Sequence, residues 1–180
     1  MSGNAYTEDQ LVEQPAIQLF AELGWATASA MEEVFGLPLP QPLSQGERGI
    51  NLGRETKGEV VLAARLRAAL ERLNAALSPE AISAAMDALT RDRSVMNVAG
   101  ANREVWELLR DGITISVSDR QRGGQKTERV RVVDWENPQA NDFLLVSQMT
   151  ITGPLYTCRP DLIGFVNGLP LVVIELKKPG

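Results

Sequence analysis

The spacing of apolar residues changes near Gly112, and this change most constrains how the chain can fold. Between residues 57 and 110, apolar residues recur at intervals of three and four, as on one face of a helix. From Ile113 onward, short apolar runs are separated by Gly, Asn and Pro, as in extended strands joined by turns. Helices followed by a run of strands predict a mixed α/β (α+β) fold, in which connected helices cover a sheet.

Helices are predicted at four places. The first follows Thr7, a favourable N-cap, and ends near Gly24, with Pro15 either kinking the helix or marking its start. The others are expected over residues 57–77, 79–90 and 102–110, the second of them with Ser78 as N-cap and Pro79 at the first helical position. Strands are predicted over residues 113–118, 130–133, 143–151, 161–166 and 169–176. We interpret the helices between 57 and 110 as a structural insert.

The composition excludes several chemistries. The chain has 180 residues, no histidine and one cysteine, Cys158. It therefore cannot form a Ser-His-Asp or Cys-His relay, an imidazole-ligated metal site, a thiolate zinc site or an internal disulfide. Proton transfer or metal binding must use carboxylates, lysine and water. No apolar run is long enough to cross a membrane and the polar start does not resemble a secretory signal, so a cytoplasmic location is expected.

The charge distribution does not favour independent binding to nucleic acid. The formal net charge is -5, whereas a module that binds nucleic acid by itself is usually basic. The segment from Asp119 to Arg131 is an exception, with five basic residues and two acidic ones. It could contact phosphates, but a solvated hairpin tip is the favoured interpretation.

The last two predicted strands place acidic and basic residues at the end of a hairpin. Asp161 opens one strand, and Glu175 and Lys177 share one face at the end of the next, buried strand. A two-residue turn at Asn167-Gly168 would set Asp161 opposite Ile174, on the wrong face. A three-residue loop would set Asp161 opposite Glu175, and a glycine bulge meets the backbone needs of such a loop. The sequence can therefore bring two carboxylates together.

Two carboxylates beside a lysine suit a Mg²⁺ site with open positions for water and a phosphate oxygen. The metal would polarise a scissile phosphate, and the ammonium group would position water or stabilise developing charge. The alternative is that Asp161 only caps the hairpin and that Glu175 and Lys177 are a solvated strand end. The residues by themselves leave both interpretations open.

A resemblance to a known family extends this interpretation. The segment RPDLIGFVNGLPLVVIELKKP resembles the core of PD-(D/E)xK nucleases, and more closely the N-terminal endonuclease domain of the R (restriction and translocation) subunit of type I restriction enzymes. Further similar segments are TEDQLVEQPAIQLFAELGW, LGRET at 52–56 and NPQANDFLLVSQMTI at 137–151. The resemblance implies one nuclease domain over 1–180, with a restriction-endonuclease-like mixed sheet at about 113–178 flanked by helices and a helical insert at about 57–110.

The resemblance also implies roles for individual residues. Asp161 and Glu175 would be the metal ligands and Lys177 the catalytic lysine. Arg159 and Lys178 would contact phosphate or support the site.

The family often adds an acid from the first helix. Glu13 is the better candidate here, because it lies eleven residues before Gly24, as in similar junction-resolving nucleases. Glu8 is the second candidate.

The function implied is that of a type I site-specific deoxyribonuclease, which hydrolyses phosphodiester bonds of double-stranded DNA with Mg²⁺. R subunits continue into a helix and an ATP-binding motor, and they work with methyltransferase and specificity subunits. These 180 residues contain no G-x-x-x-x-G-K-[ST] phosphate loop, so we expect a fragment of a larger subunit or a truncated gene product, weak or inactive when isolated. The alternative function is a catalytically silent structural or docking domain of a larger DNA-processing complex.

Overall fold

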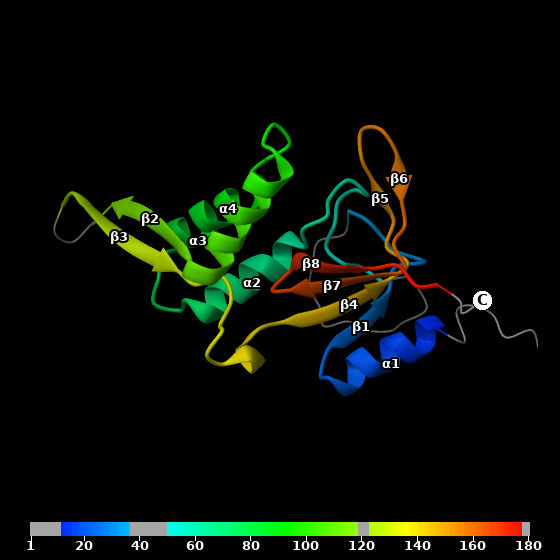
Figure 1. Ribbon diagram of the computed structural model, residues 1–180. Coiled ribbons are helices and arrows are strands. Elements are labelled where there is room, and N and C mark those ends of the chain that lie inside the picture. Colours follow the sequence, from blue (N-terminus) through cyan, green and yellow to red (C-terminus); the bar gives the residue numbers. More distant parts are fainter. Residues whose placement is uncertain (1–11, 37–49, 119–122, 178–180) are drawn as a thin grey trace, which may run out of the picture. The chain divides into compact units, whose positions relative to one another are not determined.

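A computed structural model describes residues 12–36, 50–118 and 123–177 (Figure 1). The fold is mixed α/β, with helices and a central mixed sheet, which confirms the predicted fold class. The chain divides into two compact units, Met1–Leu62 with Phe143–Gly180, and Ala63–Asp142. Within the described ranges, no helix is long and apolar enough to span a membrane.

The first unit is built on a four-stranded sheet in the order β1-β4-β7-β8 (Figure 1). Strand β1 (Ala26–Ser29) pairs in parallel with β4 (Phe143–Ser147), whereas β7 (Leu162–Val166) is antiparallel to both β4 and β8 (Leu169–Ile174). Strands β5 (Ile151–Thr152) and β6 (Thr157–Cys158) form a separate small hairpin between β4 and β7. The strand predicted over 143–151 therefore ends at Ser147. Strand β1 was not predicted from the sequence.

Helix α1 (Gln14–Glu22) precedes β1, and Pro15 lies in its first turn. Proline is tolerated there because the first N–H groups of a helix have no intrahelical acceptor. Pro15 thus marks the start of the α-helix, one of the two possibilities that the sequence left open. The proposed cap, Thr7, lies outside the described residues.

Trp25 lies between α1 and the sheet. Its ring centroid is 5.1 Å from that of Phe20 on the helix and 5.0 Å from that of Phe143 on β4. Gly164 on β7 makes room for the indole, since a Cβ at that position would lie 3.1 Å from Trp25 Cζ3. These aromatic contacts hold α1 against the sheet.

A cluster of buried apolar side chains forms the core of this unit. Its members come from β4, β7, the residues that follow β1 and β4, and the segment before α2: Ala30, Leu52, Leu62, Leu144, Val146, Met149, Ile163 and Phe165.

Arg54, from the LGRET segment, is buried within the same unit. The residue is 1% exposed, and its guanidinium forms a two-pronged ion pair with Glu33, with Nε 2.8 Å from Oε1. It also donates hydrogen bonds to the carbonyls of Glu59 at 2.8 Å and Thr150 at 3.1 Å, and lies 5.3 Å from the centroid of the Phe35 ring. Arg54 therefore joins three segments that are far apart in the sequence.

These contacts also correct the predicted helix over 57–77. Helix α2 spans Ala63–Leu73. The carbonyl of Glu59 accepts a hydrogen bond from Arg54, and the N–H of Leu62 donates to Gly168 O at 2.9 Å. Before Ala63, the backbone groups of Glu59 and Leu62 therefore form hydrogen bonds outside a helix.

The second unit contains α2, α3 (Pro79–Thr90), α4 (Val98–Asp111) and an antiparallel pair of strands, β2 (Ile113–Ser118) and β3 (Gln125–Val130). The predictions of α3 and β2 are confirmed. The helix predicted over 102–110 begins earlier because Asn97 caps it, accepting a hydrogen bond of 2.7 Å from Gly100 N–H. The strand predicted over 130–133 is instead β3, since Gly123 and Gly124 both adopt positive φ and turn the chain earlier.

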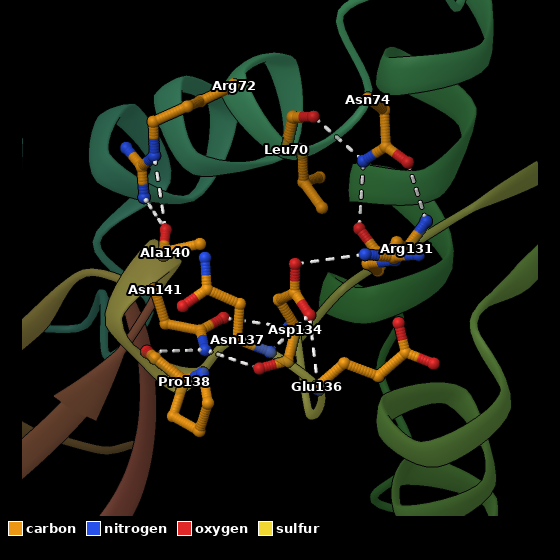
Figure 2. A network of polar contacts seen from close by, with 10 residues as sticks. All are labelled: Leu70, Arg72, Asn74, Arg131, Asp134, Glu136, Asn137, Pro138, Ala140 and Asn141. Atoms are coloured by element: carbon orange, nitrogen blue, oxygen red, sulfur yellow. Dashed lines mark hydrogen bonds and ion pairs between the residues drawn. The ribbon is translucent and has the colours of Figure 1, made fainter.

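The segment after β3 is held mainly by side chains (Figure 2). Asn74 donates to Arg131 O and accepts from Arg131 N–H, both at 2.8 Å. Asp134 accepts hydrogen bonds from the backbone N–H groups of Asn137 at 3.0 Å and Glu136 at 3.2 Å. This network replaces the regular backbone pairing that a strand or long helix would provide.

The stability of the second unit is expected to depend on pH through Asp134. The backbone N–H of Asn137 is the largest cause that lowers the pKa of Asp134, and Arg131 also lowers it. Because the pKa is lower in the folded state, the stabilisation is present above the unfolded-state pKa of about 3.9 and is lost as the pH falls through the folded-state value. Urea unfolding should therefore show the largest difference between the wild type and Asp134→Asn near neutral pH and a shrinking difference below about pH 4.

A difference for Asp134→Asn that stays constant from pH 7 to pH 3 would contradict the assignment.

Candidate active site

The turn between β7 and β8 contains two residues, Asn167 and Gly168, with φ values of 52° and 79°. Val166 pairs with Leu169 across it. Asn-Gly with both residues at positive φ is the preferred sequence for a tight hairpin turn, because Asn and Gly tolerate the left-handed region best. The three-residue loop considered from the sequence is therefore wrong.

A bulge next to this turn nevertheless changes the register. Phe165 pairs with Pro170, but Gly164 pairs with Val172, so Leu171 is an additional residue on β8. A bulge of this kind shifts the following pairs by one residue. The bulge therefore supplies, within the strand, the shift that a three-residue loop would have supplied.

Leu162 pairs with Ile174, the last pair of the two strands. If this register continued by one residue, Asp161 would lie opposite Glu175. Residues directly opposite each other in an antiparallel pair face the same side. Asp161 Oδ2 also accepts a hydrogen bond of 2.7 Å from Leu176 N–H, which ties this carboxylate to the segment that follows β8.

The predicted site residues differ in exposure. Asp161 is half-buried, whereas Glu175, Lys177 and Arg159 are exposed. Arg159 lies two residues before Asp161, after the β5–β6 hairpin. Lys178, the other predicted phosphate contact, lies outside the described residues.

Strand β8 is an edge strand of the sheet, and its middle is less buried than its apolar sequence suggests. Leu171 is 40% exposed, Val172 37% and Val173 63%. The prediction of a buried strand is therefore wrong for these residues in this chain.

Glu13, the preferred first-helix acid, is half-buried and precedes α1. Its Oε2 accepts a hydrogen bond of 2.9 Å from Gln148 Nε2. The backbone N–H of Gln148 donates to Asp161 O at 3.0 Å, so one residue connects Glu13 with the Asp161 segment. Glu8, the second candidate, lies outside the described residues.

Gln148 is not among the site residues predicted from the sequence. The available signal was a polar residue between Val146 and Met149, within a run expected to form one continuous strand.

The donor set at this sheet edge consists of carboxylate oxygens, which suit a hard cation such as Mg²⁺. Within the described residues, no three His, Cys, Asp or Glu side chains form a ready-made metal cluster. The arrangement around Asp161 and Glu175 fits an ion that keeps several waters better than an ion enclosed by protein ligands.

Comparison with known proteins identifies the family. Residues 5–180 match the family model described as type I restriction enzyme R protein N terminus. The chain belongs to this family. The type I restriction enzyme HindI endonuclease subunit of Haemophilus influenzae is 37% identical to this chain over 169 residues, 93% of this chain. The putative MjaIXP endonuclease subunit of Methanocaldococcus jannaschii is 27% identical over 176 residues, 96% of this chain.

The chain spans only 15% of the length of each of these two relatives. The family match therefore concerns the N-terminal region of R proteins.

Proposed function

We propose that this chain is a Mg²⁺-dependent endonuclease domain of a type I restriction enzyme R subunit. In this proposal Asp161 and Glu175 hold the metal and Lys177 is the catalytic lysine. The observation that supports the proposal is the bulged β7–β8 register, because its continuation past Leu162 and Ile174 would set Asp161 opposite Glu175. The family match and the names of the relatives support a role in restriction.

Each residue has a distinct part in the proposed chemistry. The N–H of Leu176 fixes the orientation of Asp161 by binding Oδ2, while Glu175 supplies oxygen donors from the adjacent segment. The exposed ammonium group of Lys177 stabilises negative charge that develops on the phosphate or positions the attacking water. Arg159, two residues before Asp161 and exposed, would contact a neighbouring phosphate. A bound Mg²⁺ would polarise the scissile phosphate and lower the pKa of its water.

The proposed substrate is double-stranded DNA in the cytoplasm, and the proposed partners are the methyltransferase and specificity subunits. ATP would be used only by a motor in a longer chain. The net charge of -5 fits a domain to which other parts of such a complex deliver the DNA.

Metal binding is the direct test of the site. Calorimetric titration of the 180-residue chain with Mn²⁺ should show weak binding, since two carboxylates leave most positions of the ion to water. Asp161→Asn and Glu175→Gln should each abolish that binding. Glu32→Gln, at an exposed position of the same unit, is the control and should bind Mn²⁺ as the wild type does.

Two results would overturn the proposal. One is undetectable Mn²⁺ binding by the wild type, and the other is binding that persists in both Asp161→Asn and Glu175→Gln. Either result would favour the alternative, a silent docking domain.

A further inference from the structure

Gln148 adopts a backbone conformation that is unusual for its residue type. Its φ is 57°, and among the described residues other than glycine only Asn167, in the β7–β8 turn, also has a positive φ. Asn is common in such turns, whereas glutamine has no special tolerance for the left-handed region. A residue in such a conformation costs free energy and persists where neighbouring structure enforces it.

The neighbours of Gln148 are fixed on both sides. Met149 is fully buried in the core, and Thr150 O accepts a hydrogen bond of 3.1 Å from buried Arg54. The N–H of Gln148 itself donates to Asp161 O at 3.0 Å. The strand therefore cannot continue straight past Ser147, and the direction of the Gln148 side chain is determined by these anchors.

The side chain of Gln148 reaches Glu13. Nε2 donates to Glu13 Oε2 at 2.9 Å in a partly buried setting, across 135 positions of sequence. An amide donor to a carboxylate is directional, so it restricts how Glu13 can rotate. Gln148 thus contacts Glu13 through its side-chain amide and the backbone of Asp161, a proposed metal ligand, through its backbone N–H.

We propose that Gln148 is a positioning residue that holds the Glu13 carboxylate at the Asp161 end of the sheet. There, the Glu13 carboxylate accepts a hydrogen bond from a water molecule bound to the divalent cation. This inference rests on the proposed function, since it assumes that Asp161 and Glu175 bind the cation. The competing explanation is that Gln148 only anchors the start of α1.

Mn²⁺ affinity separates the two explanations. In calorimetric titrations of the 180-residue chain, Gln148→Met should weaken Mn²⁺ binding by about tenfold or more, as loss of a residue that orients a metal ligand typically does. The matched control is Gln18→Met. Gln18 Nε2 donates to Glu22 Oε1 at the same distance, 2.9 Å, but on the exposed face of α1. Gln18→Met should leave the Mn²⁺ affinity unchanged.

A double-mutant comparison tests whether Gln148 acts through Glu13. Glu13→Gln alone should weaken Mn²⁺ binding, and adding Gln148→Met to it should cause little further loss. If the two losses multiply, Gln148 does not act through Glu13 and the inference is wrong.

Gln148→Gly distinguishes a positioning role from a purely anchoring role, because it allows melting temperature and Mn²⁺ affinity to be compared in one variant. Glycine adopts positive φ without strain, so the melting temperature should stay equal to that of the wild type or rise. The Mn²⁺ affinity should fall as in Gln148→Met. A lower melting temperature with unchanged Mn²⁺ affinity would show that Gln148 is only an anchor.

The failures of the two proposals are distinguishable. If Asp161→Asn and Glu175→Gln leave Mn²⁺ binding intact, the proposed function fails, and this inference fails with it. If those two variants lose Mn²⁺ binding while Gln148→Met and Gln148→Gly retain it, only the role of Gln148 is refuted.

Discussion

Replacing Arg54 by methionine is expected to lower the free energy of unfolding by about 3 to 5 kcal/mol. Methionine retains much of the side-chain volume but leaves the Glu33 carboxylate, whose side chain is 3% exposed, without its counter-ion. The carbonyls of Glu59 and Thr150 also lose a donor. An uncompensated buried charge is among the most destabilising single changes. Urea unfolding followed by circular dichroism measures the loss.

The control for this prediction is Arg67→Met. Arg67 is 44% exposed and lies 3.9 Å from Glu71, an arrangement typical of a weak surface pair. Its loss should change the unfolding free energy by less than about 0.5 kcal/mol. Combining Arg54→Met with Glu33→Met should recover part of the stability, because no charge is then left unpaired. A loss below about 1 kcal/mol for Arg54→Met would show that the ion pair contributes little.

The largest expected effect on activity is the loss of DNA cleavage in Glu175→Gln and Lys177→Met. In a chain extended to the length of the relatives, each variant should lower the rate of cleavage by about 10³-fold or more, since Glu175 would hold the metal and Lys177 would stabilise charge at the reacting phosphate. Both residues are exposed, so the unfolding free energy should change by less than about 0.5 kcal/mol. Nicking of supercoiled plasmid with Mg²⁺ at low salt measures the effect.

Two further measurements serve as references for this experiment. Ile163→Asp, at a core position that is 1% exposed, should unfold the first unit and so lose cleavage by a different route. The 180-residue chain should nick plasmid far less than the extended chain, because little positive charge is available for DNA. Full cleavage by Glu175→Gln would refute its role, and efficient nicking by the short chain would refute the need for the extension.

Local sequence determined several elements correctly. Ser78-Pro79 predicted the start of α3, where Ser78 Oγ accepts a hydrogen bond of 3.2 Å from Ala81 N–H. Asn167-Gly168 predicted the place of the β7–β8 turn, and the alternating residues of 113–118 predicted β2. These features depend on caps, turn conformations and side-chain periodicity, all of which act over a few neighbouring residues.

Tertiary contacts decided the rest. The bulge at Leu171 shifts the β7–β8 register by one residue, so that Leu162 pairs with Ile174, and the turn sequence alone does not determine this shift. Buried Arg54 keeps the residues before Ala63 out of the helix, and the anchors around Gln148 end β4. The spacing of Asp161, Glu175 and Lys177 was visible in the sequence. The contact of Gln148 with Glu13 was not, because it joins residues 135 positions apart through a backbone conformation that only the packed core enforces.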